Sequence, residues 1–133
     1  MSYLTSNIDE KTHCLKALYG DWNDALDGLG KVKGKLTEFG NGVSIMATFQ
    51  LYSSLTKFIE IVKKYNNDNE YIEQLIDCRN TIINGIKKNA FVEKNNEFKI
   101  LHGWGNDESF YVGSFNDLDN NSRDSLTSNA FYI

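Results

Sequence analysis

The sequence predicts a mainly α-helical fold in which a helical hairpin is flanked by long loops. Apolar residues recur at three- and four-residue spacing over 43–65 and again over about 70–88, as expected of two amphipathic helices. The polar run Asn66-Asn67-Asp68-Asn69 between these stretches is short. The two helices should therefore be antiparallel neighbours.

Both predicted helices carry start and stop signals. Ser44 can cap the first helix, and Asp68 or Asn69 can cap the second. Lysines lie in the last turn of each predicted helix, where positive charge interacts favourably with the helix dipole. They are Lys63 and Lys64 in the first helix and Lys87 and Lys88 in the second. The expected apolar stripes are Ile45, Phe49, Tyr52, Leu55, Ile59 and Val62 in the first helix, and Ile72, Leu75, Ile76, Ile82, Ile83 and Ile86 in the second.

The flanking segments are predicted to be less regular. Residues 1–18 predict a loop with a short turn, and residues 19–42 predict an unusually long glycine-rich loop, a feature that is usually functional. After the hairpin, 97–101 predicts one short strand and 109–114 an extended segment. Residues 125–133 predict the opening of a further helix.

Bulk composition excludes several classes of protein. A chain of 133 residues with 41% hydrophobic and 24% charged residues is typical of one globular domain. The net charge of −4 argues against general binding to nucleic acid or an anionic membrane. No secretion signal stands at the N-terminus, so a cytoplasmic location is expected. Cys14 and Cys78 lack metal-type spacing, and two free thiols are expected.

The most unusual stretch runs from Tyr19 to Gly30 and combines three acids, one Trp and three glycines. An indole suits stacking on a sugar ring, and a carboxyl group is the usual proton donor to a glycosidic oxygen. On composition alone, a turn or capping segment is an equally open interpretation. A calcium loop starting at Asp21 is excluded, because Ala25 and Val32 stand where oxygen ligands are required.

The run Gly20-Asp21-Trp22-Asn23-Asp24 resembles the general-acid segment of the inverting disaccharide and oligosaccharide phosphorylases of the cellobiose phosphorylase type. The longer run from Ala17 to Gly30 is most similar to members that act on β-1,2-linked oligoglucans. This resemblance implies that residues 1–133 are part of a catalytic domain folded as an (α/α)6 barrel. It divides the chain into a catalytic loop at 19–42, a helical hairpin at 43–89 and a second site-facing stretch at 97–133.

The resemblance also implies roles for individual residues. It assigns the role of general acid to Asp24 and places Trp22 beside the leaving sugar. It also implies that Asp21 and Asn23 either bind sugar hydroxyls or orient the loop. A general acid must be protonated near neutral pH, so its pKa must be raised by burial or by a nearby carboxylate, for which Asp21 and Asp27 are candidates. Inorganic phosphate is expected as co-substrate, with no metal or other cofactor.

Three weaker candidates follow the hairpin. His102 and Trp104 lie between glycines in a polar run that resembles a site-facing segment of the same family, although packing roles for both stay open. Asn129 stands where the relatives more often carry a Gln that faces the substrate, and it also fits a helix start capped by Thr127 or Ser128.

Two other polar clusters are expected to be solvent-exposed turns or loops rather than binding sites. The run from Asp117 to Ser122 mimics half of a calcium loop but lacks the turn glycine and the bidentate glutamate. The alternating Lys31, Lys33 and Lys35 are expected in a solvated loop rather than around phosphate.

The predicted function is inverting phosphorolysis of β-linked gluco-oligosaccharides to an α-sugar 1-phosphate. The expected partners are the oligosaccharide, phosphate, and either the remainder of a catalytic domain or a second copy of the chain. The alternative is a truncated, catalytically incompetent chain, or a glycoside hydrolase relative, that only contacts sugar. A helical interaction module leaves the clustered Trp, Asp and Gly unexplained. The last apolar pattern stops without a cap, which predicts little turnover from this chain alone.

Overall fold

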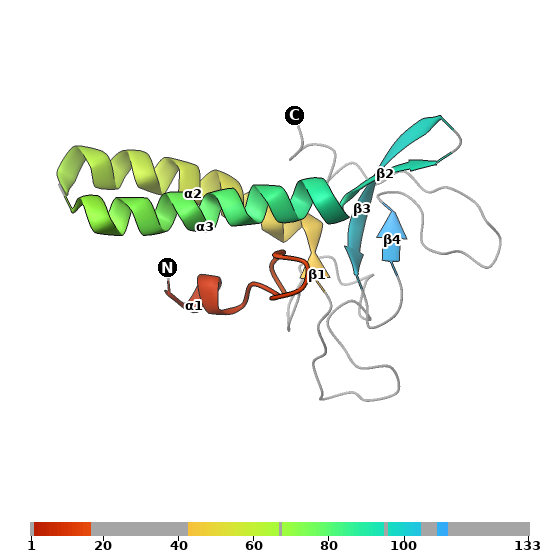
Figure 1. The fold of residues 1–133 in the computed structure, drawn as a ribbon, viewed down its shortest axis with the longest axis horizontal. Helices are drawn as coiled ribbons and strands as arrows, with labels where there is room; N and C mark the ends of the chain where they lie inside the picture. Colours follow the sequence, from red (N-terminus) through yellow and green to blue (C-terminus); the bar gives the residue numbers. More distant parts are fainter. Residues whose placement is uncertain (1, 17–42, 67, 95, 105–108, 112–133) are drawn as a thin grey trace.

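The computed structural model describes residues 2–16, 43–66, 68–94, 96–104 and 109–111. Its main feature is an antiparallel pair of long helices, α2 (Ile45–Tyr65) and α3 (Asn69–Asn89), which extends from a small sheet (Figure 1). The predicted helical hairpin and the mainly helical fold class are therefore confirmed.

The predicted caps are also confirmed. The Ser44 hydroxyl accepts a hydrogen bond from the Ala47 amide at 3.2 Å, and the Asp68 carboxylate accepts one from the Tyr71 amide at 3.1 Å. Each bond satisfies an amide that has no partner within its own helix. Val43 belongs to a strand rather than to α2, so the first helix begins later than the periodicity predicted.

The core lies along the interface of the two helices. Most of the predicted stripe is buried: Ile45, Phe49, Leu55, Ile59 and Val62 from α2, with Ile72, Leu75, Ile82 and Ile86 from α3. Three predicted members are only partly buried and pack against that core: Tyr52, Ile76 and Ile83. Removing this apolar surface from water is what holds the hairpin closed.

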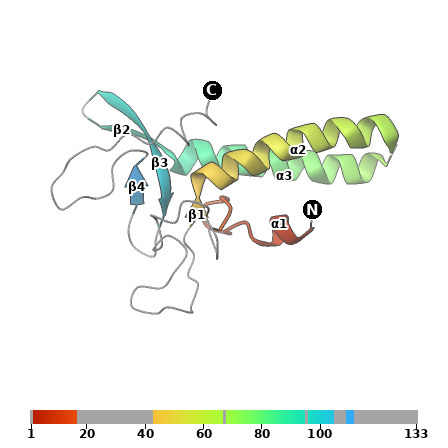
Figure 2. The same cartoon turned by 180° about the vertical axis from the view of Figure 1, so that it is seen from behind.

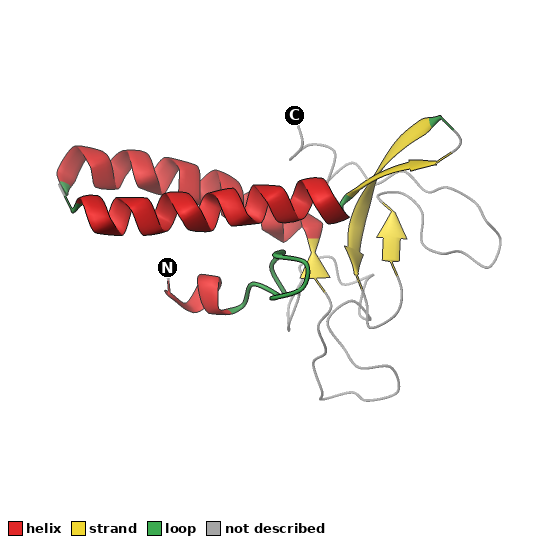
Figure 3. Ribbon diagram, viewed as in Figure 1, coloured by secondary structure: helices red, strands yellow, loops and turns green. Residues whose placement is uncertain are grey.

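The hairpin adjoins a four-stranded antiparallel sheet (Figure 3). Its strands are β1 (Val43–Ser44), β2 (Phe91–Lys94), β3 (Glu97–Trp104) and β4 (Ser109–Tyr111). β3 pairs with each of the other three strands. The strand predicted over 97–101 is confirmed as β3, which continues to Trp104, and part of the extended segment predicted over 109–114 is β4. β2 was missed.

β2 and β3 form a tight hairpin. Lys94 pairs with Glu97, which leaves two residues for the connection. Asn96 in that connection has a φ of 62°, a left-handed conformation that asparagine tolerates better than most residues.

The N-terminal segment is more ordered than the predicted loop. A short helix, α1 (Ser2–Ser6), is followed by a chain reversal in which Ile8 and Leu15 form an antiparallel bridge. Seen from behind, the segment runs from α1 toward β1 beside the hairpin (Figure 2). This path places Lys16 next to the strand that precedes α2.

Candidate functional site

The structure describes only part of the predicted site. Five predicted site residues lie outside the described ranges: Asp21, Trp22, Asn23, Asp24 and Asn129. The lysines at 31, 33 and 35 and the stretch 117–122 also lie outside them. His102 and Trp104 lie in β3, where the backbone is described. The described residues therefore include those that flank the segment 17–42 on both sides.

The segment 17–42 begins and ends at neighbouring points of the fold. Lys16, directly before it, forms an antiparallel bridge with Val43, directly after it. The Ser44 amide donates a hydrogen bond to the Leu15 carbonyl oxygen at 3.0 Å. Lys16 and Val43, which flank the segment 17–42, are thus held together by backbone pairing.

The same short strand also pairs with β3. Val43 is the partner of Trp104, and Ser44 is the partner of Gly103. Val43 therefore pairs both with Lys16 and with Trp104. The residues that flank the segment 17–42 are therefore joined to β3, which carries part of the second stretch that the sequence singled out for sugar binding.

A buried hydroxyl links this meeting point to α2. Thr48 Oγ1 accepts a hydrogen bond from the Leu15 amide at 2.9 Å and donates one to the Ser44 carbonyl oxygen at 2.6 Å. The side chains of Ser44 and Thr48 are 1% and 0% exposed. Buried polar groups are costly unless they are paired, so these bonds fix one arrangement of the backbone. We call this set the Leu15–Ser44–Thr48 network.

The chain reversal before Leu15 is built around the buried carboxylate of Asp9. Asp9 Oδ2 accepts hydrogen bonds from both the amide and the hydroxyl of Thr12, each at 2.8 Å. The His13 amide donates to the Asp9 carbonyl oxygen, and His13 takes a φ of 57°. This left-handed residue turns the chain back, so that the Asp9 amide bonds the Cys14 carbonyl oxygen at 2.8 Å.

The reversal is packed directly on α3. A Cβ atom at Gly85 would lie 2.5 Å from the Thr12 carbonyl oxygen and 2.8 Å from the His13 Cβ, so this approach requires glycine. Asn89 Nδ2 donates to the Thr12 carbonyl oxygen at 3.0 Å and to the Gly85 carbonyl oxygen at 2.9 Å. The start of α2 and the end of α3 therefore both contribute to the junction around Lys16 and Val43, the residues that flank the segment 17–42.

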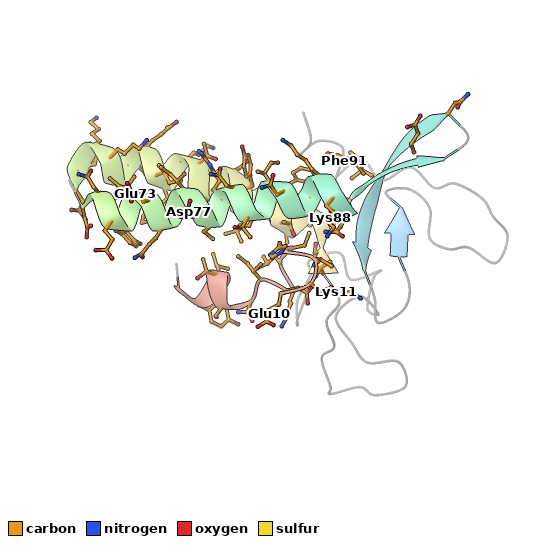
Figure 4. All side chains as sticks on the ribbon, viewed as in Figure 1. Glu10, Lys11, Glu73, Asp77, Lys88 and Phe91 are labelled. Atoms are coloured by element: carbon orange, nitrogen blue, oxygen red, sulfur yellow. The ribbon has the colours of Figure 1, made fainter. Side chains whose placement is uncertain are left out.

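The labelled side chains in Figure 4 locate this junction along the hairpin. Lys88 and Phe91 lie at the end of α3 that adjoins the sheet. Glu73 and Asp77 lie nearer the start of α3, toward the tip of the hairpin. The junction is therefore at the sheet end of the hairpin, and Asp77 is an exposed carboxylate well away from it.

The two cysteines have no role in this arrangement that would require a thiolate. Both are free thiols, as the sequence predicted. Burial raises the pKa of Cys14 to about 11 and also raises the pKa of Cys78. Neither is activated as a nucleophile. Within the described ranges, no three His, Cys, Asp or Glu side chains lie close enough together to hold a metal ion.

The comparison with protein families decides the classification. The model of the Glycosyl hydrolase 94 superfamily, catalytic domain, matches residues 2–120. The chain belongs to this superfamily. Neither a curated protein nor a solved structure matches the chain. Membership of the superfamily supports a carbohydrate-active function, and the match includes the N-terminal segment, the helical hairpin and the sheet.

The glycosyl hydrolase 94 catalytic domain is an (α/α)6 barrel, and the α2/α3 hairpin fits a fragment of such a barrel. No helix in the described ranges is long and apolar enough to cross a membrane. Sequence reasoning missed the residues that build the junction: Asp9, Thr12, Thr48, Gly85 and Asn89. Two of these had a local signal. A Thr four residues after a capping Ser can bond back to that residue's carbonyl oxygen, and an Asp can accept bonds from a Thr three residues later, as Asp9 does from Thr12.

Proposed function

We propose that this chain contributes the general acid of an inverting glycoside phosphorylase that acts on β-linked gluco-oligosaccharides, with β-1,2-linked glucans as the preferred class. Superfamily membership supports a carbohydrate-active enzyme. The observation that supports the proposal is the pairing of β1 with Gly103 and Trp104, because Val43, the residue that follows the segment bearing Asp24, lies beside the second predicted sugar-binding stretch.

In the proposed reaction, Asp24 donates its proton to the glycosidic oxygen while inorganic phosphate attacks the anomeric carbon from the opposite face. The carbon–oxygen bond to the leaving sugar breaks as the bond to phosphate forms, which inverts the configuration and yields an α-sugar 1-phosphate. No carboxylate base is needed, because phosphate is already a nucleophile. A hydrolase would require a second carboxylate to activate water.

The other predicted residues act on the sugars. Trp22 and Trp104 would offer flat apolar faces to sugar rings, and His102 would donate a hydrogen bond to a hydroxyl. Asp21 and Asn23 would bind hydroxyls or orient the loop. Asn129 would contribute an amide in place of the Gln that relatives more often carry. No metal or organic cofactor takes part in this scheme.

The test measures sugar 1-phosphate and reducing sugar released from a β-1,2-linked gluco-oligosaccharide, with and without inorganic phosphate. We expect sugar 1-phosphate only when phosphate is present, at the low turnover expected of this chain alone. Asp24→Asn should lower the rate by about 10²–10⁴-fold, the usual contribution of a general acid. Asp77→Asn is the matched control, because it removes an exposed carboxylate of α3 and should leave the rate unchanged.

The other outcomes separate the alternatives. Equal release of reducing sugar without phosphate would contradict the phosphorylase and favour a hydrolase. Sugar binding without turnover by either route would favour the catalytically incompetent chain. An unchanged rate in Asp24→Asn would remove Asp24 from the mechanism.

A further inference from the structure

We propose that one face of the helical hairpin, near its tip, is a docking surface for a second copy of this chain. Two large side chains of α2 mark it: Ile61 is 54% exposed and Tyr65 is 75% exposed. They lie in the half of α2 nearest the tip, which extends beyond α1 (Figure 1). The inference concerns how the chain associates and does not depend on the proposed function.

The same face of α2 is buried closer to the junction. Leu51, Phe58 and Tyr65 are spaced by seven residues, or about two turns, so they lie on one face of the helix. Leu51 is 3% exposed, Phe58 is half-buried and Tyr65 is largely exposed. The stripe stays apolar toward the tip while its burial falls. Exposed apolar residues that continue a buried stripe are typical of an interaction site.

α3 carries a matching stripe. Tyr71, Cys78 and Gly85 are also spaced by seven residues and share one face of that helix. Gly85 is buried, whereas Tyr71 and Cys78 are only partly buried and pack against the core. Burial on this face of α3 therefore also falls from the junction toward the tip.

The N-terminal segment shows that the two stripes lie on the same side of the hairpin. The Leu15 amide bonds Thr48, which is one turn before Leu51 in α2. The Thr12 carbonyl oxygen lies against Gly85 in α3. The segment thus crosses one side of the hairpin at the junction end of both stripes. We call the continuation of that side the tip surface, and it consists of Phe58, Ile61, Tyr65, Tyr71 and Cys78.

Exposed charged residues border the tip surface, with opposite signs on the two helices. A lysine directly precedes two stripe residues of α2, and an acid directly precedes both stripe residues of α3. The lysines are Lys57 and Lys64, and the acids are Glu70 and Asp77. Over 57–59 and 70–72, exposure falls from the charged residue through the stripe residue to a core residue. Because a helix turns by about 100° per residue, the charges lie on the two outer edges of the surface.

These charges lie at matching distances from the hairpin tip. Lys57 is eight residues before the end of α2, and Asp77 is eight residues after the start of α3. Lys64 and Glu70 are each one residue from those same ends. A two-fold rotation about an axis along the hairpin keeps these distances and places α2 of one copy over α3 of the other. Lys57 then lies opposite Asp77 of the second copy, and Lys64 lies opposite Glu70.

This match of charge and position is why a second copy fits the tip surface. The two-fold contact repeats each pair, so oppositely charged pairs border the facing apolar stripes on both sides. Apolar burial supplies the attraction, and the charges fix the orientation. Because the surface covers only the tip half of the hairpin, we expect a weak dimer with a Kd of about 10–100 µM. The chain is then monomeric at low micromolar concentration.

The experiment is sedimentation velocity over a chain concentration of about 1 µM to about 500 µM, with circular dichroism to show that each variant is folded. We expect the unsubstituted chain to shift from the mass of one chain to that of two. Lys57→Glu and Asp77→Lys each set like charges opposite each other twice, so each should raise the Kd about tenfold. A general effect of net charge would instead move the two variants in opposite directions.

An equal mixture of the two variants isolates the contact between chains. Each introduced charge then meets its opposite on the other chain, so the mixture should recover the Kd of the unsubstituted chain. Glu60→Lys is the matched control, because Glu60 is exposed in α2 and follows the core residue Ile59 on the edge away from the stripe. This variant should leave the Kd unchanged.

The contrary results are distinct. The mass of one chain at every concentration would overturn the inference and leave the tip surface to another occupant, such as a further helix of a catalytic domain. An unchanged Kd in either single variant, or a mixture as weakly associated as its components, would also overturn it. Salt on the unsubstituted chain gives a readout that needs no variant. Raising NaCl from about 50 mM to about 500 mM should raise the Kd about threefold, and a Kd that stays constant or falls would contradict the charge match.

Discussion

The helical hairpin and the junction beside it are held together by different physical means. Between α2 and α3 the fully buried residues are apolar side chains such as Leu55 and Ile82. At the junction the buried polar groups of Asp9, Ser44 and Thr48 bond specific backbone atoms. Apolar burial is strong but not directional, whereas hydrogen bonds fix register. The hairpin therefore supplies stability, and the junction fixes how the N-terminal segment lies against β1 and α2.

The largest effect is expected from a cavity in the hairpin. Leu55 is 0% exposed, so Leu55→Ala should lower the free energy of unfolding by about 2–5 kcal/mol. Ile61 lies in the same helix but is 54% exposed, so Ile61→Ala should change the free energy of unfolding by less than about 0.5 kcal/mol. Urea denaturation followed by circular dichroism measures both. Similar values for the two variants would contradict the account of the hairpin core.

A smaller effect is expected where the hairpin meets the junction. In Gly85→Ala the new Cβ would collide with the Thr12 carbonyl oxygen, which should cost about 1–3 kcal/mol despite the better helix propensity of alanine. Asn84→Ala, at an exposed neighbouring position, is the control and should not destabilise the chain. The loss should be accompanied by faster amide exchange at residues 9–16. A stabilised Gly85→Ala variant would mean that the N-terminal reversal does not pack on α3.

The smallest effect concerns pH. Burial raises the Cys14 pKa from 9.0 to about 11, so the folded chain keeps the thiol proton over a range in which the unfolded chain loses it. Stability from this group is thus present below pH 9 and is lost as pH rises toward 11. The loss should be about 1–2 kcal/mol between pH 9 and 10.5. Cys14→Ala should show a shallower decline over this range. Parallel declines for the two chains would contradict the burial of Cys14.

The sequence predicted the hairpin because its signals are local. Stripes at helical spacing, the caps at Ser44 and Asp68 and the closing lysines all lie within the elements that they define. β2 was missed because four residues without alternating hydrophobicity carry no strand signal, and its stability comes from pairing with β3. A short strand is thus defined by its partner rather than by its own sequence.

The junction could not be predicted for a related reason. Thr48 meets Leu15 across 33 positions, and Asn89 meets Thr12 across 77, so no local pattern reports either contact. The candidate acid Asp24 came from resemblance to a family, and the superfamily match agrees with that resemblance at the coarser level. The structure adds what neither source contained, namely the contacts of the residues that flank the segment carrying Asp24.

The central claim is that the segment bearing Trp22 and the strand bearing Trp104 belong to one sugar site. These are the two tryptophans of the chain, so Trp22→Phe and Trp104→Phe each leave a single indole. The decisive measurement is the fluorescence of each variant during titration with a β-1,2-linked gluco-oligosaccharide. The account predicts that both indoles respond and that both responses saturate over the same concentration range. An indole whose emission does not change at saturation would contradict a site shared by the two segments.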